Sequence, residues 1–117
     1  GEVNTLEVEA VDGNSVRDRN GAGDFKVARM PEGFREGFLI VRPEMMKMGE
    51  AASSLSNSLE GKIFNDYALG SRIQYQIRSP NGSHWLVERL QDEAFDGAIG
   101  DEVMLGWRPE DSILVSD

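Results

Sequence analysis

Cysteine is absent from the 117 residues of this sequence, and histidine occurs once, as His84. The lack of cysteine excludes disulfides, thiol chemistry and zinc sites with Cys ligands. One histidine cannot form a metal centre built from several imidazoles. No apolar run approaches the roughly 18 residues that a membrane-spanning helix needs. We therefore expect no bound metal, no cofactor and no direct insertion into a membrane.

Positive charge is also scarce. Twelve Lys and Arg face 21 Asp and Glu, which gives a formal net charge of −9 and a pI near 4.5. Nucleic-acid binding needs cations that neutralise phosphates, and anionic lipid attracts basic surfaces. The charge balance disfavours both partners. It is typical of an acidic surface that keeps a domain soluble.

What the sequence does contain is a repeated tripeptide. Arg42-Pro43-Glu44 follows the apolar run 38–41, and Arg108-Pro109-Glu110 follows the apolar run 103–107. Each half also opens alike, with Asn4-Thr5-Leu6-Glu7 and Asn57-Ser58-Leu59-Glu60. Internal similarity constrains the whole fold. We predict one domain of two related β-units, at about 1–50 and 55–117, with Val41 and Trp107 buried where each core strand ends.

Short strands separated by turn signals fill most of the length. Alternation of apolar and polar residues and Gly, Asn or Pro turns predict strands at 6–11, 15–19, 25–28, 38–41, 59–67, 72–78, 85–87, 103–107 and 113–115. The segment 44–57 is the irregular connection. Less than roughly a tenth of the chain is expected in α-helix, against an average of about a third. This pattern predicts an all-β fold, a small barrel or sandwich, in which Gly61, Gly70 and Gly106 allow strands to bend.

The two arginines of the repeat are the most evident candidate site residues. Arg42 and Arg108 would meet an anion or an acidic partner in a functional role. In a structural role each would pair with a nearby carboxylate, such as Glu44 or Glu110, and fix the turn after its strand. Proline favours extended geometry in the residue before it, so we favour the structural role.

Two further groups have a structural and a functional interpretation. The methionines Met45, Met46 and Met48 would form either an adaptable contact surface or core filler in a short strand, and Trp85 and Trp107 would anchor a ligand or fill the core. We favour the core in both cases. We expect His84 to be exposed in a hairpin. The carboxylates of the acidic loop lack calcium-loop spacing and are interpreted as solvated: Asp92, Glu93, Asp96, Asp101 and Glu102.

The order of these motifs resembles a known family. Asn57-x-Leu59-x-Gly61-Lys62-Ile63, then Leu69-Gly70-Ser71, then Gly100-Asp101-x-Val103-x-Leu105-x-Trp107-x-Pro109-Glu110-Asp111 is similar to the TOBE domain. This domain ends the ATP-binding subunits of bacterial ABC importers, here of the polyamine, iron and sugar type. The resemblance covers essentially the whole chain and implies an OB-like barrel with additional strands.

The resemblance also implies a function. It predicts a non-catalytic regulatory and dimerisation domain, located in the cytoplasm and held at the inner membrane by its transporter. Its partners would be its own ATPase domain, a second copy of the subunit and the importer's membrane subunits, with no nucleic acid.

The start at Gly1 and the absence of a signal peptide predict a fragment of a longer protein. No phosphate-binding Gly-x-x-x-x-Gly-Lys-Ser/Thr loop occurs in the sequence, and we find no nucleophile–base constellation, so we expect no catalytic residue. The alternative is a module that senses an oxyanion or the transported solute.

Overall fold

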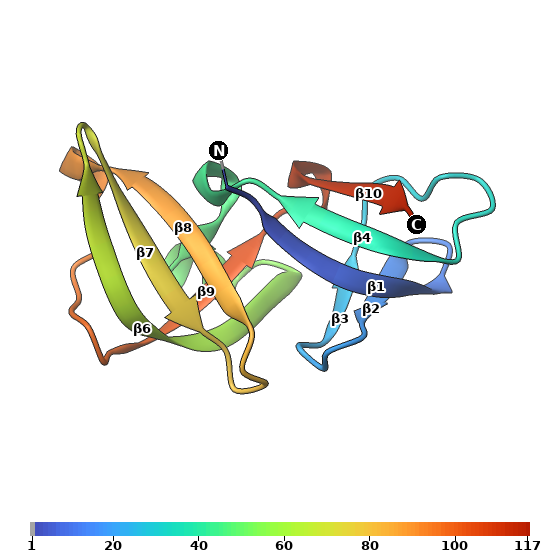
Figure 1. Cartoon of the computed structure of the whole chain (residues 1–117), viewed down its shortest axis with the longest axis horizontal. Helices are drawn as coiled ribbons and strands as arrows, with labels where there is room; N and C mark the ends of the chain where they lie inside the picture. The colour runs from blue at the N-terminus through green and yellow to red at the C-terminus, as the bar shows by residue number, and fades with distance from the viewer. Residues whose placement is uncertain (1) are drawn as a thin grey trace.

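The computed structural model describes residues 2–117 as two five-stranded antiparallel sheets that lie side by side along the long axis of the molecule (Figure 1). The first sheet has the order β10-β4-β1-β2-β3, and the second has the order β5-β9-β6-β7-β8. Within residues 2–117 the helical content is one four-residue helix, α1 (Glu50–Ser53), and three short 3₁₀ turns. The prediction of an all-β fold made of two related β-units is confirmed.

The first sheet is built from β1 (Asn4–Asp12), β2 (Ser15–Asp18), β3 (Asp24–Lys26), β4 (Glu36–Val41) and β10 (Ser112–Ser116). The second contains β5 (Lys47–Met48), β6 (Asn57–Leu69), β7 (Arg72–Arg78), β8 (His84–Leu90) and β9 (Glu102–Trp107). The 3₁₀ turns are η1 (Pro43–Met45), η2 (Gln91–Glu93) and η3 (Pro109–Asp111). The predicted strands are all present, with β6 longer than expected and β3 shorter.

The two sheets exchange their last strands. After β4 the chain passes through η1 and forms β5, which pairs with β9 in the second sheet, Met48 opposite Leu105. After β9 it passes through η3 and forms β10, which pairs with β4 in the first sheet, Leu114 opposite Leu39. The boundaries of the sheets therefore differ from the sequence units at about 1–50 and 55–117. A short strand with core-filling methionines was expected in the segment 44–57, and β5 is that strand, but its pairing with β9 was not predicted.

Equivalent residues of the two units have equivalent partners. Asn4 lies opposite Val41 in the first sheet, and Asn57 lies opposite Trp107 in the second. Both strand ends are buried, with Val41 1% and Trp107 0% exposed. The expectation that the two Arg-Pro-Glu segments leave comparable core strands is confirmed.

One continuous apolar core joins the sheets. Alternate residues of each strand point inward, because the side-chain period of a strand is two. The ring of Trp107 stacks on that of Trp85 at 5.7 Å and meets that of Phe25 at 4.7 Å, so the largest side chains of both sheets meet in the middle. The core includes Val8, Val16, Leu39, Val41, Met46, Ile63, Tyr75, Ile77, Val87 and Leu105.

Glycine permits two close approaches in the second sheet. A Cβ on Gly106 would lie 2.3 Å from the carbonyl oxygen of Asn57, and one on Gly61 would lie 2.4 Å from the Ile77 side chain. The register of β6 against β7 shifts between Ile63 and Asn65. The bulge therefore lies at Phe64, and Gly61 marks a close approach instead.

Candidate functional site

The first candidate feature is the pair of asparagines that open the two units. Asn4 donates from Nδ2 to the carbonyl oxygen of Leu86 at 2.8 Å and accepts from the Leu86 amide at 2.7 Å. Asn57 makes the same two bonds to Lys26, at 2.9 and 2.7 Å. Each asparagine thus caps the edge strand of the opposite sheet. These reciprocal bonds are called the asparagine clamps below. Their buried amides are 5% and 0% exposed, so the clamps hold the two sheets together.

The two Arg-Pro-Glu turns share one backbone geometry. Arg42 and Arg108 are extended residues before a 3₁₀ turn, with φ, ψ of −69°, 141° and −80°, 144°. Proline fixes φ at the first position of a 3₁₀ or α turn and lacks an N–H that would go unused there. Glu44 and Glu110 are exposed in both turns. The shared tripeptide therefore works as a strand terminator that redirects the chain to the other sheet.

The side chains of the two arginines behave differently. Arg108 donates from Nε and Nη2 to Asp111 at 2.9 and 3.3 Å. The hydrogen bond and charge of Asp111, with a smaller effect of Glu110, raise the pKa of Arg108 above its usual value. Arg42 makes no ion pair within 4.0 Å among the described residues, because Met45 stands where the other turn has Asp111. The expected pairing with a nearby carboxylate is confirmed for Arg108, with Asp111 in place of Glu110, and is not found for Arg42 among the described residues.

The methionine cluster is divided between core and surface. Met46 is 0% and Met48 is 7% exposed, whereas Met45 is 37% exposed. Met46 and Met48 fill the core beside β9, so they are not available to a partner. Alternation around η1 and β5 points Met46 and Met48 inward, so the core interpretation is confirmed for these two, and a contact surface at Met45 stays a prediction.

The remaining candidates of the sequence lie where the structural interpretation puts them. Trp85 and Trp107 are buried, and Trp85 donates from Nε1 to Ser79 Oγ at 2.9 Å. His84 is exposed and accepts at Nε2 from Arg78 Nε at 3.2 Å. The acidic loop from Asp92 to Glu102 forms no carboxylate group fit for a metal, and none occurs elsewhere in residues 2–117. No helix in that range is long and apolar enough to cross a bilayer.

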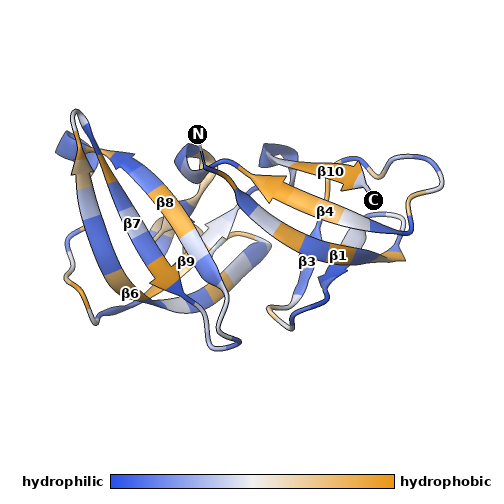
Figure 2. Cartoon of the chain, in the orientation of Figure 1, coloured by the Kyte–Doolittle hydropathy of each residue, from blue (hydrophilic) through white to orange (hydrophobic). Residues whose placement is uncertain are grey.

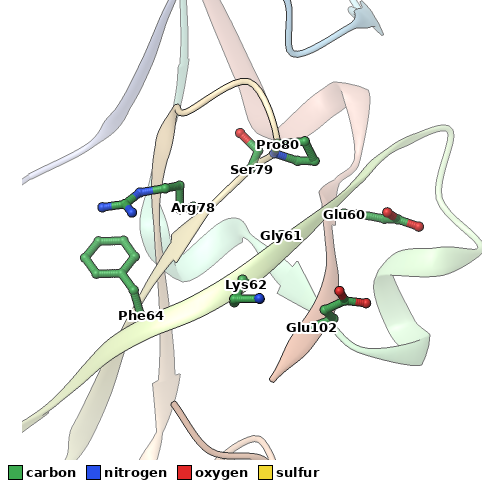
Figure 3. A pocket seen from close by; sticks show the side chains of 8 residues that line it. All are labelled: Glu60, Gly61, Lys62, Phe64, Arg78, Ser79, Pro80 and Glu102. Carbon is green, nitrogen blue, oxygen red and sulfur yellow. The ribbon is translucent and has the colours of Figure 1, made fainter. Parts of the chain in front are cut away.

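A shallow hollow of about 340 Å³ on the outer face of the second sheet was not predicted (Figure 3). Its floor is Gly61, and the Phe64 ring carries the guanidinium of Arg78 at 5.0 Å. Figure 3 shows Glu60 and Glu102 on one side of Lys62, with Arg78 and Phe64 on the other. Two carboxylates and two cations lie around this hollow, so it selects no ligand by charge. The alternation that places residues 60, 62 and 64 on one face of the strand was the signal available in the sequence.

Within residues 2–117 these features define a β-module of two joined sheets, and comparison gives its family. The chain belongs to the TOBE domain family, whose model matches residues 39–115. The matched range runs from β4 to β10 and includes both Arg-Pro-Glu turns.

Two known proteins are similar to this chain. The spermidine/putrescine import ATP-binding protein PotA of Rubrobacter xylanophilus is 34% identical over 115 residues, which cover 92% of this chain and 30% of that protein. The cytoplasmic molybdate-binding protein ModG, in a crystal form with molybdate bound, has the same fold with a TM-score of 0.80 at 10% identity. That match covers 97% of this chain and 96% of the ModG chain. The chain thus spans about a third of the transport protein and nearly all of ModG.

Proposed function

We propose that this chain is the non-catalytic regulatory and dimerisation domain of the ATP-binding subunit of a bacterial ABC importer of the polyamine type. The observation that carries the proposal is the 34% identity to a spermidine/putrescine import ATP-binding protein over 92% of this chain. ATP hydrolysis would belong to the part of the subunit outside this sequence. The domain would then lie in the cytoplasm, at the inner membrane, through the transporter.

The geometry suits a domain that transmits force rather than one that performs chemistry. Two exchanged strands and two asparagine clamps cross between the sheets. Displacing one sheet relative to the other breaks buried backbone hydrogen bonds, and each unsatisfied group costs about 1–3 kcal/mol. The module therefore moves as one body. Its partners would be its own ATPase domain, a second copy of the subunit and the membrane subunits.

A graft tests the importer assignment. The matching segment of the Rubrobacter protein is replaced by this chain, and ATP-dependent spermidine uptake is measured in vesicles with the remaining transporter subunits. We expect uptake to be retained. The control graft carries Asn4→Ala and Asn57→Ala, which remove the clamps, and should lose uptake. A folded graft that binds the membrane subunits but supports no uptake contradicts the proposal.

The second candidate function is sensing of a small ligand. It is favoured by the ModG fold and by Arg42, an exposed guanidinium without an ion-pair partner in the described chain. Calorimetric titration with molybdate and with spermidine distinguishes the two functions. Micromolar molybdate binding that is lost in Arg42→Ala supports sensing, and no heat with either ligand supports the regulatory role. Mg-ATP is the negative control, because the sequence contains no phosphate-binding loop.

A further inference from the structure

The free edges of the two sheets are protected unequally. At β3 the Lys26 amide and carbonyl are taken by Asn57, and at β8 those of Leu86 are taken by Asn4. The edge strand β5 has only two residues and leads into α1 through a bond from the Gly49 amide to the Met104 carbonyl. Proteins protect edge strands because unpaired N–H and C=O groups are a template for another strand. Among the four edges, β10 alone has none of these protections.

The side chains of β10 add to this exposure. The strand Ser112–Ser116 contains no charged residue, no proline and no bulge in its pairing with β4. Ile113 is 56% and Val115 is 43% exposed, and they lie opposite Ile40 and Phe38 of β4. Figure 2 shows β4 and β10 as a hydrophobic region at the border of the first sheet. We call Phe38, Ile40, Ile113 and Val115, with the open backbone of β10, the β10 edge.

Charge indicates what covers this edge. The chain has a net charge of −9, so two copies repel each other over most of their surface. Along Ser112–Ser116 they can meet without facing like charges, because the strand contains no charged residue, whereas a partner selected by charge would need a charged edge. The nearest acid before the strand, Asp111, is already paired with Arg108 at 2.9 Å.

A two-fold axis makes this strand complementary to itself. In antiparallel pairing centred on Leu114, Ile113 of one copy faces Val115 of the other, twice, and serine faces serine at the ends. Cross-strand pairs of β-branched residues are favourable, and a two-fold contact uses the same patch on both copies. In this register Asp117 of one copy faces Asp111 of the other. The guanidinium of Arg108, which is paired with Asp111, offsets the repulsion between the two carboxylates.

We propose that this chain forms a two-fold dimer in which the β10 edges of two copies pair antiparallel and join their first sheets. This inference rests on the proposed function, since it names the surface through which a dimerisation domain associates. The contact centres on one five-residue strand from each copy, fewer than the roughly 20–30 residues a side of a standard interface, so the dimer is weak. Salt strengthens it, because repulsion between acidic surfaces is screened.

Sedimentation equilibrium of the whole chain at low and at about 0.5 M salt tests the pairing. We expect the wild-type chain to show a monomer–dimer equilibrium, and Ile113→Lys and Val115→Glu each to raise the dimer dissociation constant by roughly tenfold or more. The matched control is Ile99→Lys, which changes another exposed isoleucine, 58% exposed, by the same charge. Because lysine lowers the net negative charge, a weaker Ile113→Lys dimer reflects the edge and not overall repulsion.

Mixing the two edge variants gives the decisive measurement. Each variant dimer contains two mismatched pairs, whereas a mixed dimer contains one Lys–Glu pair and one wild-type Ile–Val pair. We expect mixing Ile113→Lys with Val115→Glu to restore dimers, which also shows that both variants fold. A wild-type chain that stays monomeric, an Ile113→Lys variant that matches Ile99→Lys, or a mixture without rescue overturns the proposal. Each of these would leave the importer assignment intact, because the graft tests it separately.

Discussion

The two connections that carry the chain from one sheet to the other begin alike and end differently. Both leave a core strand through Arg-Pro-Glu and a 3₁₀ turn, and both then add a strand to the opposite sheet. The first connection adds a strand of two residues. Gly49, at φ 80°, then turns the chain into α1. The second adds five and continues to the end of the sequence. The tripeptide sets the direction of the chain, and the residues after it set how far the added strand covers its new neighbour.

Substitution of the two clamp asparagines has the largest expected effect and tests whether the two halves are equivalent. Asn57→Ala leaves the amide and carbonyl of Lys26 without their side-chain partners, and Asn4→Ala does the same at Leu86. Each change is expected to lower the free energy of unfolding by about 3 kcal/mol, since two buried backbone bonds are lost. Urea unfolding measures the loss. Asn14→Ala, at an exposed turn, is the control. A loss in only one half shows that a single clamp holds the sheets.

Gly106 tests how tightly β9 and β6 approach. In Gly106→Ala the new Cβ meets the Asn57 carbonyl at 2.3 Å, and backbone cannot move aside as a side chain can. We expect a loss of about 2 kcal/mol or more, measured by urea unfolding. Gly13→Ala is the matched control, because its Cβ meets nothing within 4 Å. Equal stability of the two variants would contradict the close approach.

The sequence predicted the strands and their exits better than their partners. The alternation at Ile73, Tyr75 and Ile77 is a local property, so β7 was found, and the repeat placed Val41 and Trp107 at equivalent strand ends. The role of Asn4 was not found, because its partner Leu86 is distant in the chain and in the other sheet. Exchange of β5 and β10 was missed for the same reason, since local pattern does not specify which strand pairs with which.

The pairing of Arg108 was missed for a more local reason. In a 3₁₀ turn the residue three positions on lies above the first, so Asp111 faces Arg108 and Glu110 points away. The hollow beside Phe64 depends on the bulge in β6, whereas the sequence indicated only that the strand can bend at Gly61. The sequence thus predicted which types of residue stand at the candidate site. Their contacts could not be predicted, because they depend on the geometry of the turn and on the strand register.

The two arginines offer a smaller test of the comparison. Arg108→Ala should lower the melting temperature slightly at low salt and hardly at all at about 0.5 M, because exposed ion pairs are weak and screened. Arg42→Ala should change neither melt. Met45→Asp places a carboxylate where the other turn has Asp111, and should raise the melting temperature at low salt. If Arg42→Ala lowers the melting temperature more than Arg108→Ala does, the assignment of Arg42 as the unpaired arginine is contradicted.

The first hairpins of the two sheets give the smallest expected effect. The β1–β2 turn is capped by Asp12, which accepts from the Asn14 amide at 3.0 Å and from Ser15 Oγ at 2.7 Å, whereas the β6–β7 turn uses Gly70 at φ 64°. The bonds from Asn14 and then Ser15 hold the pKa of Asp12 below its ordinary value of 3.8.

A depressed carboxyl pKa contributes stability above the unfolded value, and this contribution is lost as the pH falls through the folded value. We expect Asp12→Asn to be slightly less stable than wild type at neutral pH, with the difference vanishing in strong acid. An NMR titration should place the Asp12 pKa below 3.8 and show it rising in Ser15→Ala. An Asp12 pKa at or above the ordinary value would contradict the cap.

The strand exchange has a consequence for how the chain is made. A ribosome delivers β1 to β4 early, yet β4 is paired only with β1 until Ser112–Ser116 has left the exit tunnel. During that interval Phe38 and Ile40 lie on an open edge strand of the first sheet. The speed of translation through the second half therefore sets how long this open edge can pair with another chain. Removal of the last six residues would leave the edge open permanently.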